Sequence, residues 1–292
     1  MTYLTEPLAE ATNVTKRFGH VTAVSSVSFA VRPGEVVGLL GANGAGKTTV
    51  IRILLGLLGP TTGDVHLMGG PPDREHRSRI GYVPQSLGLY RDLTVAENLQ
   101  FVAQTYHAPA PALPPQLREQ QRRLVGDLSL GLQRQVAFVC ALLHSPALLV
   151  LDEPTSGVDP VARAELWNTI TEQAERGVGA LVTTHYMQEA QQCDRLLLMS
   201  AGRLVAEGSE ADIIGDTTAV QIVTPVWAAA FAALNAASLP VTLAGRAVRV
   251  ANTDPGLIQA VLDNANVPAT VSFAPATIEE RMTVLDRLGQ SG

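Results

Sequence analysis

The sequence predicts an α/β fold, in which a mixed sheet carries a phosphate-binding loop and a small α+β domain follows. Continuous apolar runs at 147–151 and 180–184 are typical of parallel strands covered on both faces. A glycine-rich stretch lies between a third apolar run and a helical pattern. The pattern changes after about residue 216 of the 292 residues, so we predict two domains, 1–216 and 217–292.

The glycine-rich stretch, Gly41-Ala-Asn-Gly-Ala-Gly-Lys-Thr48, matches the pattern G-x-x-x-x-G-K-[ST]. In such a loop backbone N–H groups surround a polyphosphate, the lysine contacts its terminal phosphates, and the hydroxyl reaches Mg²⁺. We predict a buried strand over 35–40 before the loop and a helix over 47–58 after it, whose N-terminal dipole points at the anion. The candidate nucleotide-binding residues here are Gly41, Asn43, Gly44, Ala45, Gly46, Lys47, Thr48 and Thr49.

Apolar residues alternate through the first thirty positions, which predicts a small layer of antiparallel strands ahead of the phosphate loop. Phe18 lies in this layer and is followed by Gly19. Its position favours a packed side chain, whereas an exposed ring at this place could stack on a nucleobase.

Residues from about 87 to 145 are expected to form an inserted helical subdomain. A strand over 80–85 ends at Gln85, and Thr94 with Glu97 forms a capping box that opens a helix to about residue 106. The proline-rich segment 108–115 is expected to be extended, and a short helix over 116–125 follows it.

Ser129 and Gly131 precede the second strong helix of this region, predicted over 132–144. A serine and a glycine at a helix N-terminus can cap the helix or bind an anion. The helical periodicity does not separate the two roles.

Two adjacent acids, Asp152 and Glu153, follow the apolar run 147–151. At the carboxyl edge of a parallel sheet, Asp152 can hold Mg²⁺ and Glu153 can deprotonate a water for in-line attack on the γ-phosphate. The alternative role for the pair is to cap the helix predicted over 161–175. His185 follows the strand 180–184, where it can donate a hydrogen bond to the γ-phosphate or to the attacking water.

The C-terminal domain shows the order strand, helix, strand, strand, helix, strand, with an added helix over 278–288. This βαββαβ order suggests a split βαβ, ferredoxin-like unit. The domain carries no cluster of catalytic residue types, so we expect it to be a regulatory or interaction domain.

Composition and charge restrict the possible partners and location. Charged residues make up 16% and the formal net charge is −6, so we expect no nucleic-acid partner. There is no signal-peptide pattern and no run of about 18 apolar residues, so we expect a chain that is soluble when isolated and needs another polypeptide for any membrane role. Cys140 and Cys193 suit a reducing cytosol better than a disulfide framework.

Six short motifs occur in one order and at suitable spacings: the phosphate loop, Gln85, Leu128-Ser129-Leu130-Gly131, Asp152-Glu153, Ser156-Gly157-Val158-Asp159 and His185. With these motifs, residues 8–215 resemble the nucleotide-binding subunits of ABC transporters, which are P-loop NTPases. A phosphate loop alone would also fit a kinase, a GTPase or a helicase, and the Leu-Ser-x-Gly segment argues against those three.

The resemblance implies a nucleotide site for ATP and Mg²⁺ in this chain. Phe18 would stack on adenine, and Lys47 would bind the β- and γ-phosphates. Thr48 and Asp152 would hold Mg²⁺, and Gln85 would sense the metal and the water and relay to a membrane partner.

The resemblance also implies a catalytic group and a dimer. Glu153 would be the general base, and His185 would brace the γ-phosphate. Ser129 and Gly131 would act on the ATP held by a second nucleotide-binding subunit, in a head-to-tail dimer that is expected to be a homodimer, and Asp159 would couple the two sites. Hydrolysis would then drive transmembrane permease partners at the cytoplasmic face of the cell membrane.

Two segments resemble a subclass that pairs with small permeases exporting drugs or similar amphiphiles: Leu87 to Phe101, and the C-terminal end near Thr277 to Glu280.

Two departures from the family pattern leave alternatives open. The usual Leu-Ser-Gly-Gly-Gln is Leu-Ser-Leu-Gly-Leu at 128–132, and the stretch 106–128 is about one helix shorter than usual.

One alternative is a soluble regulatory ATPase of the same family, which the single set of motifs disfavours. Another is the hydrolysis-impaired half of a heterodimeric transporter. The leucines Leu130 and Leu132 favour this alternative, whereas Glu153 and His185 oppose it.

Overall fold

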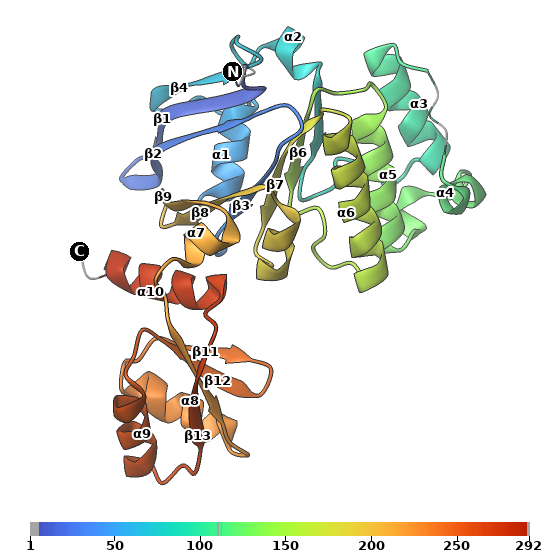
Figure 1. Ribbon diagram of the computed structural model, residues 1–292. Helices are drawn as coiled ribbons and strands as arrows, with labels where there is room; N and C mark the ends of the chain where they lie inside the picture. Colours follow the sequence, from blue (N-terminus) through green and yellow to red (C-terminus); the bar gives the residue numbers. More distant parts are fainter. Residues whose placement is uncertain (1–5, 110, 112, 291–292) are drawn as a thin grey trace. The chain divides into compact units, whose positions relative to one another are not determined.

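The computed structural model describes residues 6–109, 111 and 113–290, which form two compact units that meet in sequence between Leu204 and Val205 (Figure 1). Within these described ranges no helix is long and apolar enough to cross a bilayer.

The first unit is built on a six-stranded sheet in the order β5-β6-β7-β3-β8-β9, and the pairs from β5 to β8 are parallel. All residues of β3, β6 and β7 are buried, as the continuous apolar runs predicted. The strands are β3 (Val36–Leu40), β5 (Ile80–Val83), β6 (Leu148–Asp152), β7 (Gly179–Thr184), β8 (Arg195–Ser200) and β9 (Arg203–Gly208). Strand β9 begins in the first unit and continues past the boundary at Leu204.

Two layers cover the central sheet, one on each face. Val37 and Leu39 of β3 pack with helix α1 (Lys47–Leu54) and a three-stranded antiparallel sheet, β2-β1-β4. Val36, on the other face of β3, packs with residues of α5 (Leu130–Leu142) and α6 (Pro160–Glu175). Figure 1 shows these two helices beside the sheet. The antiparallel sheet confirms the predicted N-terminal layer and consists of β1 (Ala9–Phe18), β2 (Val21–Val31) and β4 (Thr62–Leu67).

Helix α3 (Val95–Tyr106) begins with the predicted capping box, since the Thr94 side chain accepts from the Glu97 N–H and the Glu97 carboxylate accepts from the Thr94 N–H. The next helix, α4 (Pro115–Gln120), is shorter than expected. The main-chain oxygens of Gln121 and Arg123 accept hydrogen bonds from the first amides of α3, so these residues cannot continue a helix.

The expected extended segment 108–115 includes residues 110 and 112, which lie outside the described part of the chain. Pro115 at its end is helical instead, at the first position of α4, where a missing N–H costs nothing. Four short helices of the described chain were not predicted: α2 (Arg74–Arg77), η1 (Val125–Asp127), η2 (Met187–Gln192) and α7 (Glu210–Ile214).

The second unit contains a four-stranded sheet in the order β11-β12-β10-β13, and each neighbouring pair is antiparallel. Helices α8 and α9 pack on the face that carries Val220, Ile222, Val248 and Val250. The elements are α7 (Glu210–Ile214), β10 (Ala219–Val223), α8 (Trp227–Ala236), β11 (Val241–Ala244), β12 (Ala247–Ala251), α9 (Pro255–Asn264), β13 (Thr270–Ala274) and α10 (Ile278–Gln290).

An ion pair fixes α10 to the second unit. Arg249 Nε of β12 donates to Glu280 Oε1 at 2.7 Å, and Glu280 is 1% exposed. The Glu280 carboxylate also accepts from the Thr277 N–H and hydroxyl, at 2.7 Å each. Burial alone would raise the pKa of Glu280, but the hydrogen bonds from Arg249 and Thr277 lower it below its ordinary value.

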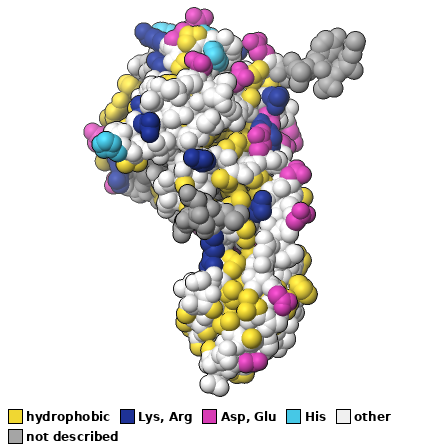
Figure 2. Space-filling view, turned by 90° about the vertical axis from the view of Figure 1, so that its left-hand side faces the viewer, with side chains coloured by type: hydrophobic (Ala, Val, Ile, Leu, Met, Phe, Trp, Pro, Cys, Tyr) yellow, Lys and Arg dark blue, Asp and Glu magenta, His cyan; other side chains and the backbone are white. Residues whose placement is uncertain are grey.

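The second unit also presents apolar side chains to solvent, and Figure 2 shows hydrophobic atoms gathered on one face of it. Phe273, on the edge strand β13, is 74% exposed. Exposure of apolar side chains alone does not identify a partner, so no function is assigned to this ring.

Candidate functional site

The phosphate loop joins β3 to α1, and its glycines adopt conformations that other residues avoid. Gly46, with φ of 103°, precedes the first residue of α1, and a Cβ there would lie 2.7 Å from the Ala23 carbonyl oxygen. A cavity of 340 Å³ lies over the loop. Its lining comprises Ala23, Asn43, Gly44, Ala45, Gly46, Lys47, Thr48, Thr49, Gln85 and Glu153.

Lys47 is a buried cation at the loop, only 6% exposed. Its Nζ donates to the main-chain oxygens of Gly41 at 2.6 Å and Ala42 at 3.2 Å, and it lies 3.7 Å from Glu153 Oε1. Burial lowers the pKa of Lys47, and the carboxylates of Glu153 and Asp152 act in the opposite direction. The loop therefore holds one ammonium group beside its ring of backbone amides.

Asp152, the last residue of β6, is held between two hydroxyl groups. Thr48 Oγ1 donates to its Oδ2 at 3.0 Å, and Thr183 Oγ1 of β7 donates to its Oδ1 at 2.7 Å. The carboxylate and the Thr48 hydroxyl provide oxygen atoms next to the loop, and oxygen is the ligand atom that Mg²⁺ prefers.

The Glu153 carboxylate lies among three polar side chains of the site. Its Oε2 accepts from Gln85 Nε2 at 3.3 Å and lies 3.4 Å from His185 Nδ1, while its Oε1 faces Lys47. Its backbone has φ of 51°, a left-handed conformation that is uncommon for a residue other than glycine. Helix α6 is capped by Asp159, so the predicted alternative, in which Asp152 and Glu153 cap this helix, is wrong.

Ser129, Gly131 and Asp159 form a second group that contributes nothing to the lining of the loop cavity. Ser129 Oγ accepts from the Leu132 N–H at 3.4 Å and caps α5, which begins two residues earlier than predicted. Asp159 caps α6 by accepting from two amides at 3.0 Å each. A Cβ on Gly131 would lie 3.8 Å from Asp159 Oδ2, so the two helix caps are neighbours.

Phe18 ends β1, and its side chain is 50% exposed. The prediction that the Phe18 ring is packed, which its position favoured, is therefore wrong. The Lys16 ammonium lies 5.2 Å from the ring centroid, and Phe18 is outside the lining of the loop cavity.

Two residues at the site were missed by the sequence reasoning. Thr183 lies opposite Asp152 in the strand register, and its hydroxyl accepts from the Glu153 N–H at 2.9 Å. Arg134 of α5 is 3% exposed, and its Nη2 donates to the Ser156 carbonyl oxygen at 3.2 Å. Burial lowers the pKa of Arg134, whereas Glu153 raises it. A charged residue within an apolar helix pattern was the signal available for Arg134.

The family model described as "ABC transporter" matches residues 24–156. The chain is 44% identical over 215 residues to the Nod factor export ATP-binding protein I of Burkholderia lata, covering 69% of this chain and 71% of that protein. The chain belongs to the ABC transporter ATP-binding proteins. Members of this family are ATPases that power transport.

A second relative of this ABC protein is the probable multidrug ABC transporter ATP-binding protein YbhF of Escherichia coli (strain K12). The two are 40% identical over 220 residues, which cover 71% of this chain and 38% of the relative. The chain thus spans well under half the length of that relative.

A solved structure similar to this ABC protein is the dimeric post-hydrolysis state of the ATP-binding cassette MJ0796 bound to ADP and Pi. Its TM-score is 0.60 and its identity 25%, covering 69% of this chain and 98% of that one. The fold of the first unit is that of an ABC cassette, with the P-loop sheet and the antiparallel layer.

We expect the Thr183→Val change in this ABC protein to lower ATP hydrolysis by about 10- to 100-fold, the usual range for loss of a hydrogen bond that orients a metal ligand, the role expected for Asp152. The methyl group keeps the volume but no longer donates to Asp152 or accepts from the Glu153 amide. Steady-state hydrolysis over a Mg²⁺ titration would measure the loss. Thr171→Val, an exposed change in α6, is the matched control, and equal rates for the two variants would contradict the role given to Thr183.

Proposed function

We propose that this chain is the ATP-hydrolysing subunit of a membrane exporter. The single observation that carries the proposal is the convergence of Lys47, Gln85 and His185 on the Glu153 carboxylate, beside the phosphate loop. A cation for phosphate and a base for water lie within one cavity, which is the arrangement that phosphoryl transfer to water requires.

The residues present fit MgATP. The backbone of the loop packs so closely at Gly46 that a side chain would collide with Ala23, so only a bare loop of amides can form this cradle. Asp152 and the Thr48 hydroxyl would hold Mg²⁺, with Gln85 nearby. When bound, the metal supplies positive charge to the phosphate oxygens. Phe18, exposed at the end of β1, would stack on adenine.

In the proposed mechanism each side chain has one task. Lys47 binds the terminal phosphates together with the loop amides. The Glu153 carboxylate accepts a proton from the attacking water. His185 donates a hydrogen bond toward the γ-phosphate or the water. Thr183 fixes the Asp152 carboxylate and the Glu153 backbone, so both acids keep their orientation.

The second group, Ser129, Gly131 and Asp159, supports a head-to-tail homodimer. These residues contribute nothing to the loop cavity of their own chain, and Ser129 and Gly131 lie at the N-terminus of a 13-residue helix, where backbone amides can bind phosphate. We infer that they complete the ATP site of a second subunit, and that Asp159 couples the two sites. The related cassette described as dimeric and bound to ADP and Pi supports this arrangement.

The exporter class rests on the relatives, whose names include multidrug transport and Nod factor export. The chain would bind permease subunits at the cytoplasmic face of the membrane. The second unit has the element order βαββαβ and the antiparallel strand order β11-β12-β10-β13, which support a ferredoxin-like, regulatory or interaction domain.

Light scattering on the Glu153→Gln protein tests the dimer. Removal of the base is expected to preserve bound ATP, so Mg²⁺-ATP should convert a monomer of about 31 kDa into a dimer of about twice that mass. The same protein without nucleotide should remain monomeric.

The control is a Ser129→Arg version of this protein, since a bulky cation at the second group should block association without touching the loop. If the Glu153→Gln protein with Ser129 intact binds ATP and stays monomeric, the homodimer is wrong, and a second, different nucleotide-binding chain is required. A protein that binds no ATP would overturn the proposed function itself.

A further inference from the structure

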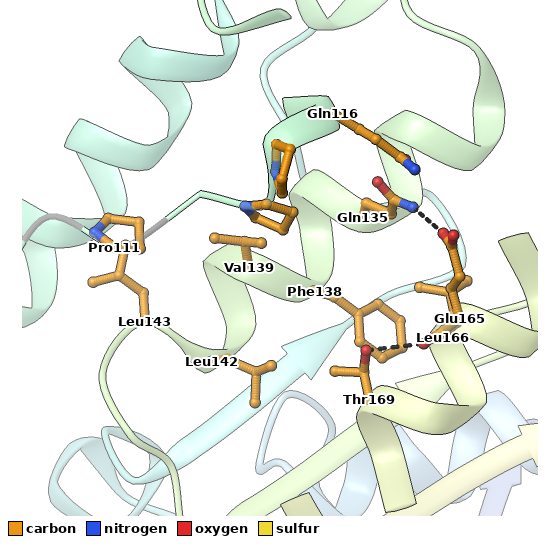
Figure 3. A pocket seen from close by; sticks show the side chains of 12 residues that line it. Pro111, Gln116, Gln135, Phe138, Val139, Leu142, Leu143, Glu165, Leu166 and Thr169 are labelled. Atoms are coloured by element: carbon orange, nitrogen blue, oxygen red, sulfur yellow. Dashed lines mark hydrogen bonds between the residues drawn. The ribbon is translucent and has the colours of Figure 1, made fainter. Parts of the chain in front are cut away.

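A second cavity, of 580 Å³, lies between α4, α5 and α6 and shares no lining residue with the phosphate-loop cavity (Figure 3). Most of its wall is apolar. Phe138 and Leu142 from α5, Leu166 from α6 and Pro115 at the start of α4 contribute to it. This volume falls within the range of small-molecule sites, about 300–1,000 Å³.

Among the described residues that line this cavity, Glu165 is the only charged one. Its Oε2 accepts from Gln135 Nε2 at 2.6 Å, the contact drawn in Figure 3. In the described ranges of the chain, Glu165 forms no ion pair with a lysine, arginine or histidine. A carboxylate beside apolar walls, without a cation of its own, attracts a cationic ligand.

Gln135 adds a second acceptor at the same place. Its Oε1 is buried, and no partner for it exists among the described residues. Because its amide nitrogen is engaged with Glu165, the oxygen can be satisfied only by a donor from elsewhere. The Thr169 hydroxyl, which also lines the cavity, already donates to the Glu165 main-chain oxygen at 2.9 Å. The polar corner of the cavity therefore presents two acceptors, the Glu165 carboxylate and Gln135 Oε1, and no positively charged side chain among the described lining residues.

We propose that this cavity binds a small hydrophobic ammonium ion. The apolar body of the ligand packs between Phe138, Leu142 and Leu166, and its N–H groups donate to Glu165 and to Gln135 Oε1. One ammonium group supplies both the charge and the donors, whereas a quaternary ammonium supplies only the charge. An anion is repelled by Glu165, and a neutral alcohol leaves the carboxylate without a counter-charge.

The site is independent of the ATP-hydrolysing function proposed above, because it uses none of the same residues. Helices α5 and α6, which form most of its wall, begin at the caps Ser129 and Asp159. A ligand between these helices therefore contacts the two elements at whose N-termini the three members of the second group lie.

Three probes of matched shape test the proposal on the full chain: 4-phenylbutylammonium, 4-phenylbutanol and 4-phenylbutyrate. Calorimetric titration should show saturable binding of the ammonium, at least about tenfold tighter than the alcohol, since hydrogen bonds to charged groups exceed neutral ones. The butyrate should show no binding. Saturating ATP should not displace the ammonium, which separates this site from the phosphate loop.

Glu165→Gln should reduce the preference for the ammonium over the alcohol to about threefold or less, because the amide keeps the shape and loses the charge. Glu175→Gln, an exposed change on the same helix, is the matched control and should leave the preference unchanged. Val139→Trp, which fills the cavity, should abolish binding of the ammonium and of the alcohol, with circular dichroism verifying the fold.

The proposal fails if the unchanged chain binds none of the probes. It also fails if the ammonium and the alcohol bind equally, or if Glu165→Gln leaves the preference intact. Since Glu165→Gln is nearly isosteric, this arm remains decisive even if the tryptophan variant does not fold.

Discussion

The Glu153→Gln protein should hydrolyse ATP about 10²- to 10⁴-fold more slowly than the unchanged chain, the range usual for loss of a general base. The amide has almost the same shape and can still contact Gln85 and Lys47, but it cannot accept a proton from water. ATP affinity should stay within about threefold, because the phosphate loop and Lys47 are untouched. Single-turnover hydrolysis and equilibrium nucleotide binding measure the two quantities separately.

Lys47→Ala gives the contrasting result, with hydrolysis lost because nucleotide binding is weakened. Among the described residues that line the cavity, Lys47 is the only cation, so its removal takes away the side-chain charge that would bind phosphate. If Glu153→Gln hydrolysed ATP at the normal rate, another group would be the base, and the role given to Glu153 would be wrong.

The Glu280→Ala protein should lose about 3–5 kcal/mol of stability in its second unit, the usual cost of removing one partner of a buried ion pair. Arg249, which is 9% exposed in the unchanged chain, would lose its carboxylate partner, and the start of α10 would lose the acceptor of the Thr277 amide. Hydrogen exchange of the β10 and β12 amides, followed by mass spectrometry, measures the loss in that unit alone.

Glu279→Ala is the matched control, because this neighbouring side chain is exposed.

The stability difference between the Glu280→Ala protein and the unchanged chain should also depend on pH. Because folding lowers the pKa of Glu280, its contribution is complete above the unfolded pKa, near 4.5, and disappears as the pH falls through the folded value. A difference that persisted unchanged at strongly acidic pH would contradict the ion-pair explanation.

The sequence predicted most of what local pattern can specify. The buried strands β3, β6 and β7 lie where continuous apolar runs placed them, and Ser129 and Thr94 cap their helices, because these signals operate within a few residues. The polar residues that follow the strands also meet beside the loop, as parallel strands require.

Contacts between distant segments could not be predicted in this way. Thr183 supports Asp152 because β7 neighbours β6 in the sheet, and strand order is not written in a local pattern. Likewise, α4 ends early because the backbone at Gln121 pairs with the start of α3. The Arg249–Glu280 pair joins a strand to a helix, and the two residues are 31 positions apart in the sequence. No local pattern at either residue predicts that the other is its partner.

The position of Glu153 ties recognition of phosphate to the reactivity of the base. Its carboxylate lies 3.7 Å from the lysine of the loop, accepts from Gln85 and lies 3.4 Å from His185. The side chain that would recognise phosphate therefore also sets the electrostatic environment of the proton acceptor. A substitution at Lys47 acts on both properties at once, so neither can be adjusted alone at this position.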